Sequence, residues 1–208
     1  MNDSTTPIND FLAAAAAKQP TPGGGSVAAL VGALAASMGE MTLNYSVNKK
    51  GLEQHRDALQ SILTECTRAR EVLVQLMVED QEAFAAVSAL RKLPQDTPDL
   101  AQRRTAALLA CIRIPQTIAA TSVALLDRCE RIVDLANPYL LSDLAVCADL
   151  AMATARCAAY NVRVNLADVS DPAERQAIET AVNNLLLRGT TIIQRVIPRI
   201  WKRHADTK

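Results

Sequence analysis

Residues 26–47, with the sequence SVAALVGALAASMGEMTLNYSV, form a long apolar stretch of the chain. The stretch is long enough to cross a membrane, but Ser37, Glu40 and Asn44 interrupt it. A carboxylate in the middle of a membrane span is costly, whereas a helix that is apolar on all sides fits inside a bundle of other helices. The stretch therefore predicts a buried central helix, and no membrane partner is expected.

The composition of the whole chain agrees with a helical fold. Half of the 208 residues are hydrophobic, only 3% are aromatic, and alanine and leucine dominate. Alanine and leucine favour helices, whereas aromatic and β-branched residues favour strands. Lysine plus arginine number 22 and aspartate plus glutamate number 22, so the formal net charge is zero. The chain therefore lacks the basic surplus typical of proteins that bind nucleic acid or anionic membranes.

Proline, glycine and polar residues divide the chain into six predicted helices. The segment QPTPGGGS at residues 19–26 separates the first two, and Ser26 is the expected N-cap of the second. Pro115 is expected to kink the fourth helix, and Pro198 to disturb the last turns of the sixth. The predicted helices cover residues 7–18, 26–48, 52–90, 98–135, 142–166 and 172–208.

These predicted helices are long and the joints between them are short, which favours antiparallel packing. No repeat and no low-complexity linker divides the chain. The predicted fold class is therefore all-α, a single-domain bundle of about six helices over residues 1–208. The abundant apolar surface also predicts self-association, most simply as a symmetric homodimer.

The five cysteines show neither a metal-binding nor a disulfide pattern. Their number is odd, no pair has C-x-x-C spacing, and the chain has only two histidines. No metal site is therefore predicted. The chain opens on polar and acidic residues and not on an apolar signal segment, so a cytoplasmic protein is expected.

One carboxylate interrupts the apolar stripe of the third predicted helix. Steps of three and four residues place Asp80 on the stripe, between Met77 and Phe84. A carboxylate on a buried face must be paired, neutral or turned toward a cavity. Two alternatives follow, a structural ion pair with an arginine or a carboxylate of a functional site.

Further polar residues lie on otherwise apolar helices. Asp143 and Asn161 are eighteen residues apart, which is five full helical turns, so they point the same way, and Asn165 lies close to that direction. Asp143 also lies in a first turn, where a carboxylate interacts well with the helix dipole, so a structural role is an alternative for it. Glu40 is the one carboxylate of the second predicted helix.

The glycine-rich turn GGGS at residues 23–26 stands at the start of the second predicted helix. Its backbone N–H groups suit an anion or a carbonyl oxygen, although a tight chain reversal also explains the glycines. The turn is not a P-loop, because no Gly-Lys-Ser/Thr follows it. His55 lies in a polar stretch and His204 in the tail, so catalysis by a nucleophile–histidine triad is not expected.

Three segments together resemble the signatures of one known family. They are PTPGGGSVAAL at residues 20–30, EDQEAF at residues 79–84, and NP at residues 137–138 followed by SDLAV at 142–146 and NVRVNL at 161–166. In this combination the chain resembles the cyclodeaminase/cyclohydrolase family. That family comprises formimidoyltetrahydrofolate cyclodeaminase, methenyltetrahydrofolate cyclohydrolase and the C-terminal domain of formiminotransferase-cyclodeaminase. The resemblance covers nearly the whole chain, in order and at plausible spacing.

The resemblance implies an all-helical, dimeric fold and one-carbon chemistry on a tetrahydrofolate substrate, without a metal or nucleotide cofactor and without a formiminotransferase half. Carboxylates stabilise the delocalised cation of a methenyl bridge, and a carboxylate with a raised pKa can move the proton that the reaction needs. Asp80 is the first catalytic candidate, and Glu40 and Asp143 are the others. The candidate substrate-binding residues are Gly23, Gly24, Gly25, Ser26, Asn137, Asn161, Asn165, Lys49 and Lys50.

Four of these residues receive individual binding roles from the chemistry of folate. Asp143 and Asn161 suit paired hydrogen bonds to the amino-pyrimidine edge of the pterin. Lys49 and Lys50 suit the carboxylates of the glutamate tail, with an ordinary solvated loop as the alternative.

The loop after the fourth predicted helix departs from the family pattern and leaves the reaction open. The family usually has glycine before Asn-Pro and small polar residues after it, whereas this chain has Ala136 before it and YLL at residues 139–141 after it. The favoured reaction is hydrolysis of methenyltetrahydrofolate to formyltetrahydrofolate. Cyclisation of formimidoyltetrahydrofolate with release of ammonia is the other. A catalytically inactive folate-binding or structural helical dimer is the alternative from another class, and a helical adaptor without a ligand is the third.

Overall fold

A computed structural model describes residues 4–206, so the first three and last two residues of the predicted domain 1–208 lie outside the described residues. Over this range the chain forms six α-helices and two short 3-10 turns, and no strand. The helices are α1 (Ile8–Ala16), α2 (Gly24–Asn44), α3 (Arg56–Arg91), α4 (Leu100–Ile132), α5 (Leu141–Leu166) and α6 (Pro172–Asp206), and the 3-10 turns are Glu53–His55 and Pro138–Leu140. The predicted all-α class with about six helices is confirmed.

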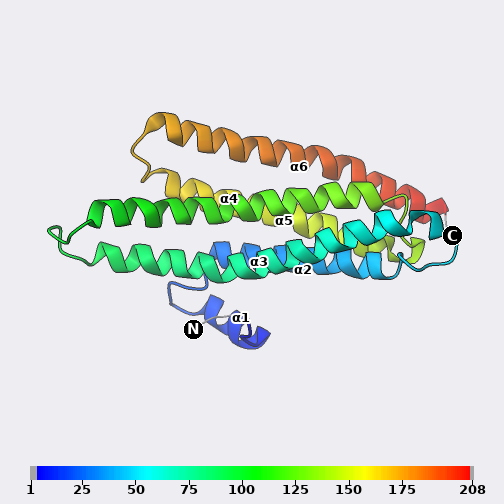
Figure 1. The fold of residues 1–208 in the computed structure, drawn as a ribbon, viewed down its shortest axis with the longest axis horizontal. Coiled ribbons are helices and arrows are strands. Elements are labelled where there is room, and N and C mark those ends of the chain that lie inside the picture. The colour runs from blue at the N-terminus through cyan, green and yellow to red at the C-terminus, as the bar shows by residue number, and fades with distance from the viewer. Residues whose placement is uncertain (1–3, 207–208) are drawn as a thin grey trace.

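The apolar helix α2 lies against α3 and α5, and small side chains make this close packing possible (Figure 1). Apart from Leu43, the buried residues of α2 are glycine, alanine, serine or threonine. A Cβ atom at Gly32 would come within 3.0 Å of Thr154 on α5, and one at Gly39 within 3.3 Å of the Cys147 sulfur. The backbones of α2 and α5 therefore lie too close for larger residues at these two points.

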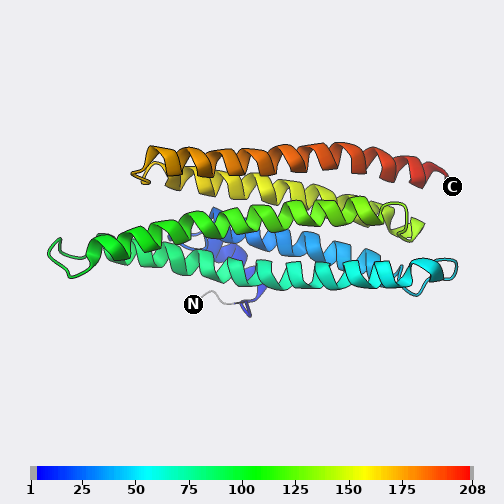
Figure 2. The same cartoon turned by 45° about the horizontal axis from the view of Figure 1, so that its top comes forward.

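The remaining helices complete the bundle around this pair. The helices α3 and α4 form a long antiparallel hairpin, and α6 lies along α4 and α5 (Figures 1 and 2). The short helix α1 lies outside the bundle, and its one buried residue, Phe11, joins the main hydrophobic core. Ion pairs tie α6 along the surface to α4, through Arg188 with Asp127 and Arg195 with Glu130. Arg199 pairs with Asp134 just beyond α4.

Within residues 4–206, two helices have the length and composition of a membrane span, namely α2 and α4. In α2, 56% of the most apolar stretch of 18 residues is buried inside the bundle. Burial of this kind is what the core helix of a bundle shows, as the sequence predicts for residues 26–47.

Several helix boundaries differ from the predicted ones. The helix α2 begins at Gly24 with Gly23 at its N-cap, so the prediction that Ser26 caps it is wrong. The reason is that the Ser26 hydroxyl is directed to a side chain of α3 and not to the backbone of its own helix. Pro115 lies within α4 and Pro198 within α6, and both helices continue beyond these prolines.

Candidate functional site

The N-terminus of α2 provides the floor of the candidate site, because the side chain of Asp80 from α3 lies directly on it. A Cβ atom at Gly25 would lie 2.0 Å from Oδ1 of Asp80 and 2.8 Å from Oδ2. Any side chain at Gly25 would therefore displace the carboxylate. The glycine of the turn is required here for the close approach of Asp80 to the backbone.

Ser26 holds the Asp80 carboxylate in this position. The Ser26 hydroxyl donates a hydrogen bond of 2.8 Å to Oδ2 of Asp80, and the Ser26 backbone N–H also bonds to the carboxylate. Burial raises the pKa of Asp80 above its ordinary value, and the two bonds from Ser26 oppose that rise. Among the described residues no cation pairs with Asp80, so the alternative of an arginine ion pair is wrong.

Two asparagines of α5 face the same end of α2. A Cβ atom at Gly24 would lie 3.2 Å from Oδ1 of Asn161, so this side chain also touches the first turn of α2. The Nδ2 group of Asn161 donates to the carbonyl of Cys157, and that of Asn165 donates to the carbonyls of Cys111 and Asn161. Backbone carbonyls take both N–H groups of Asn165 and one of the two of Asn161, so the amide oxygens and the second N–H of Asn161 remain for a ligand.

These groups line a cavity of about 170 Å³. Its lining joins the loop before α2 to the helices α3, α4 and α5, and consists of Pro20, Thr21, Gly23, Gly24, Gly25, Asp80, Phe84, Cys111, Asn161, Val164 and Asn165. One acid–base group, two amides and a helix N-terminus therefore meet at a mostly apolar cavity, which is the usual composition of a small-molecule site.

A second group of the predicted site residues lies near the far end of α2. Lys49 donates a hydrogen bond of 2.6 Å to Oδ1 of Asn137, and its Nζ lies 5.0 Å from the centre of the Tyr139 ring. Asn137 also bonds to Ser46 and to the carbonyl of Tyr45, so it fastens the loop after α4 to the end of α2. Lys50 is exposed beside them.

The helical rise separates the two groups. The 21 residues of α2 span about 30 Å, and the eighteen residues from Asp143 to Asn161 span about 27 Å. Asp143 and Asn161 share a direction on α5, but in one chain they cannot bind the same pterin edge, so that combined role is wrong for a single subunit. For the same reason Lys49 and Lys50 are remote from the cavity at Asp80.

Glu40 lies between the two groups and is engaged by α3. Its carboxylate accepts hydrogen bonds from Nε of Arg70 at 2.6 Å and from the hydroxyl of Thr67 at 2.9 Å. It lies fifteen residues along α2 from Gly25, which is about 22 Å. The structure therefore does not bring Glu40 to the Asp80 cavity of the same chain.

Comparison with known proteins places this arrangement in a family. A sequence model described as formiminotransferase-cyclodeaminase matches residues 7–184 of the chain. The chain belongs to the formiminotransferase-cyclodeaminase family. The match includes the glycine-rich turn, Asp80 and both asparagines of α5.

Individual relatives of this family agree in sequence and in fold. A methenyltetrahydrofolate cyclohydrolase from Methylorubrum extorquens is 30% identical over 91% of this chain and 93% of its own length. The formimidoyltransferase-cyclodeaminase of Gallus gallus is 29% identical over 97% of this chain, which spans only 38% of that protein. The crystal structure of a formiminotetrahydrofolate cyclodeaminase from Thermotoga maritima superposes with a TM-score of 0.88 at 27% identity, covering 95% of this chain and 97% of that chain.

Among the residues that line the cavity, Cys111 lies outside every segment that the sequence predicted for the site. It comes from α4, lines the cavity, and its carbonyl orients Asn165. Burial, together with the nearby Asp80 charge, raises the pKa of its thiol, so the thiol is neutral around pH 7. No local signal marks it, because its nearest neighbours on the same face of α4, Leu108 and Pro115, are apolar.

Proposed function

We propose that the chain is a folate one-carbon enzyme that hydrolyses methenyltetrahydrofolate to formyltetrahydrofolate, with Asp80 as its acid–base group. The observation that carries this proposal is the half-buried Asp80 carboxylate at the cavity, held by Ser26 and without a cation partner among the described residues. The cyclohydrolase relative, matched over nearly its whole length, favours hydrolysis over the alternative reaction. No metal or nucleotide cofactor enters the proposal.

The proposed mechanism moves one proton through Asp80. The ionised carboxylate accepts a proton from a water molecule as the water oxygen bonds to the methenyl carbon. The same proton then passes to the ring nitrogen as its bond to that carbon breaks. The remaining hydroxyl proton is released to solvent as the C=O bond forms, which leaves the formyl group on the other nitrogen. A carboxylate whose pKa is raised by burial is a stronger base than an ordinary aspartate, and it suits both transfers.

The charges around the cavity suit this substrate. The methenyl bridge carries a delocalised positive charge, and the ionised Asp80 stabilises it at short range in a partly desolvated site. The amide oxygens of Asn161 and Asn165 are acceptors for the N–H groups of the pterin.

Cyclisation of formimidoyltetrahydrofolate is the second candidate, because the closely superposing Thermotoga maritima protein is a cyclodeaminase. In that reaction the bridge nitrogen attacks the formimidoyl carbon and gives up its proton to the departing nitrogen. A protonated Asp80 would donate the second proton, so that this nitrogen leaves as ammonia. The same residue therefore serves both candidate reactions, and only the one-carbon group of the substrate differs.

We also propose that a second copy of the chain covers the exposed face of α2 and α5. Along each helix, six exposed or half-buried positions follow a seven-residue repeat. They are Val27, Val31, Leu34, Met38 and Met41 on α2 with Tyr45 at its C-cap, and Val146, Leu150, Ala153, Cys157, Tyr160 and Val164 on α5. A continuous apolar face of this kind marks an interface, and its repeat suits helix-on-helix packing in a symmetric dimer.

The same dimer would explain why the family signatures lie in two groups. If the two-fold axis runs across α2 and α5, the helices of the two copies are antiparallel. The end of one copy that carries Asn137 and Asp143 then lies over the end of the other that carries Asp80 and Asn161. Val164 belongs both to the exposed face and to the cavity lining, so the second copy would close the cavity mouth.

The proposed activity is tested by the decay of methenyltetrahydrofolate absorbance in a buffer where spontaneous hydrolysis is slow. Protein-dependent decay is expected, and Asp80→Asn is expected to reduce it by about 10²- to 10⁴-fold while the helical circular dichroism is unchanged. Unchanged turnover in Asp80→Asn would remove Asp80 from the mechanism.

Formimidoyltetrahydrofolate, with ammonia release as the readout, is the matched second substrate. Turnover of this substrate alone would assign the cyclodeaminase reaction. Binding of both folates without turnover of either would contradict the proposed enzyme and support the alternative of an inactive folate-binding dimer.

A further inference from the structure

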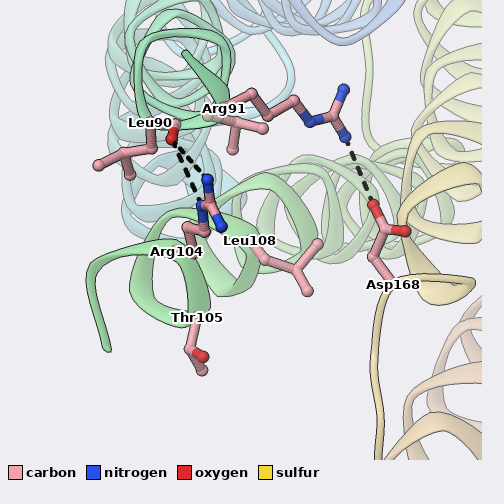
Figure 3. Close-up of a pocket in the computed structure, with 7 residues that line it drawn as sticks. Leu90, Arg91, Arg104, Thr105, Leu108 and Asp168 are labelled. Carbon is pink, nitrogen blue, oxygen red and sulfur yellow. Dashed lines mark hydrogen bonds and ion pairs between the residues drawn. The ribbon is translucent and has the colours of Figure 1, made fainter. Parts of the chain in front are cut away.

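A second cavity, of about 250 Å³, lies where the ends of α3, α4 and α5 meet (Figure 3). Its lining is Val87, Leu90, Arg91, Arg104, Thr105, Leu108 and Asp168. Two arginines therefore face an otherwise largely apolar cavity. None of these residues belongs to the candidate site at Asp80.

The second cavity continues the first one along the same three helices. On α3, Phe84 lines the first cavity and Val87 the second. On α4, Cys111 lines the first and Leu108 the second. Asn165 near the end of α5 lines the first cavity, and Asp168 just beyond α5 lines the second. Each pair is three residues apart, about one helical turn, so the two cavities lie end to end.

The two arginines are positioned differently. Arg104 is anchored, because its guanidinium donates to the carbonyl of Leu90 at 3.1 Å (Figure 3). It also donates to the Gln95 side chain at 3.1 Å. Arg91 reaches across the cavity to Asp168, with 3.5 Å between the charged atoms, and both side chains are more than half exposed. A guanidinium has five N–H donors, so both arginines keep donors for an incoming carboxylate.

We propose that this second cavity binds the glutamate tail of the folate substrate, with Arg91 and Arg104 as partners of its carboxylates. The inference rests on the proposed function and adds a substrate subsite to it. It also replaces Lys49 and Lys50 as tail-binding residues within one chain, because those lysines lie near the opposite end of α2.

The spacing of the two cavities matches the length of this ligand. Bond lengths give about 10 Å from the bridge nitrogen of folate, across the aminobenzoyl ring, to the first glutamate carboxylate. Arg104 lies seven residues along α4 from Cys111, which is about 10 Å and returns to the same face of the helix.

The size and charge of the combined site agree with the same ligand. Neither cavity alone reaches the roughly 300 Å³ at which typical ligand sites begin, whereas the two end to end do. The apolar walls at Val87 and Leu108 suit the aminobenzoyl ring between the two polar ends. A carboxylate of the glutamate tail would replace the Asp168 carboxylate as the ion-pair partner of Arg91.

The test compares two substrates that differ only in the tail. They are the tetrahydrofolate form that the protein turns over and the corresponding tetrahydropteroate, which lacks glutamate. Arg91→Gln and Arg104→Gln are expected to raise KM for the folate about tenfold, leave kcat unchanged, and have no effect on the pteroate. Asp168→Asn is expected to lower KM for the folate roughly two- to fivefold, because it frees Arg91 and removes a repelling charge.

Arg103→Gln is the matched control, since Arg103 precedes Arg104 on α4, is exposed, and does not line the cavity. It should change neither substrate's kinetics. An equal loss on folate and pteroate in Arg91→Gln would show a structural role and overturn the tail site, as would unchanged kinetics on both substrates. Arg104 also donates to the carbonyl of Leu90, so Arg104→Gln could misfold. In that case the kinetics of Arg91→Gln alone test the tail site. A wild-type protein inactive on every folate and pteroate form would overturn the proposed function, and the tail site with it.

Discussion

Gly25 is the residue on which the position of the Asp80 carboxylate depends. Because a Cβ atom there would lie 2.0 Å from Oδ1 of Asp80, Gly25→Ala must push the carboxylate off the N-terminus of α2. We expect the variant to fold, since alanine suits a helix, and to lose activity about 100-fold, because misplaced acid–base groups lose most of their effect. Steady-state turnover together with circular dichroism checks both expectations.

Gly23 offers the control for this substitution within the same turn. A Cβ atom at Gly23 would meet only the carbonyl of Pro20, at 3.9 Å, which is an ordinary contact. Gly23→Ala should therefore leave the Asp80 carboxylate in place and reduce the rate far less than Gly25→Ala does. A comparable loss in both variants would show that the whole turn, and not the contact with Asp80, is sensitive to substitution.

Ser26 sets the pH range in which Asp80 is ionised. In the proposed hydrolysis the ionised carboxylate is the active form, so activity falls as pH drops through the pKa of Asp80. Burial raises this pKa, and the bonds from Ser26 hold it down. Ser26→Ala removes the hydroxyl that stabilises the charged form, so the acid limb of kcat/KM should move to higher pH.

Ser37→Ala is the control for the pH profile. The Ser37 hydroxyl lies on the same helix but donates to the carbonyl of Ala33, so its loss should leave the acid limb in place. An acid limb that stays fixed or moves to lower pH in Ser26→Ala would mean that a group other than Asp80 titrates.

At the scale of the element, α6 is attached by two kinds of contact with very different strengths. Its buried residues Ile192, Val196 and Ile200 join the main hydrophobic core. Its arginines form ion pairs at the surface with α4 and with Asp134 just beyond it. Exposed ion pairs contribute little, because water screens them, whereas a truncated core side chain leaves a cavity.

The free energies of unfolding of two variants compare the contributions of the core contacts and the ion pairs. Ile192→Ala, at a side chain only 2% exposed, should lower the free energy of unfolding by about 2–5 kcal/mol. Arg199→Met, at a side chain 40% exposed, should lower it by less than about 1 kcal/mol. Urea denaturation followed by circular dichroism gives both values. A larger loss in Arg199→Met than in Ile192→Ala would show that the ion pairs hold α6 in place.

At the scale of the whole molecule, the apolar face of α2 and α5 makes the proposed dimer testable. Leu34 is 50% exposed on α2 and Tyr160 is 64% exposed on α5, both within the seven-residue repeats. We expect Leu34→Asp and Tyr160→Asp to yield monomers in sedimentation or light-scattering experiments, because an unpaired charge inside an interface is strongly unfavourable. Leu187 on α6 is 67% exposed but lies outside this face, so Leu187→Asp should leave the dimer intact.

Mixed dimers test whether the two ends of the face form one site. Asp80→Asn alters one end, and Lys49→Gln alters the other, where Lys49 bonds to Asn137. If each variant is inactive alone and the site is shared, mixing them should restore about a quarter of the wild-type activity. Half of randomly formed dimers would be mixed, and each mixed dimer would contain one intact site. Two inactive variants that restore nothing when mixed would contradict a shared site.

The sequence by itself determined the features that depend on short-range helical geometry. The composition and the apolar stretch of residues 26–47 predicted the all-α bundle, because an apolar helix must be covered by others. The three-to-four spacing placed Asp80 on a buried face, and the glycine-rich turn predicted an open helix N-terminus. The placement of Asp80 needed only the helical period, and the other two inferences needed only composition and local turn chemistry.

Only the tertiary structure decided which of these residues meet. The contacts of Asp80 with Gly25 and Ser26, and the alignment of Arg91 with Arg104, depend on how α3 is shifted along α2 and α4. Periodicity specifies the face of a helix and not this axial shift, which the packing of small and large side chains between helices sets.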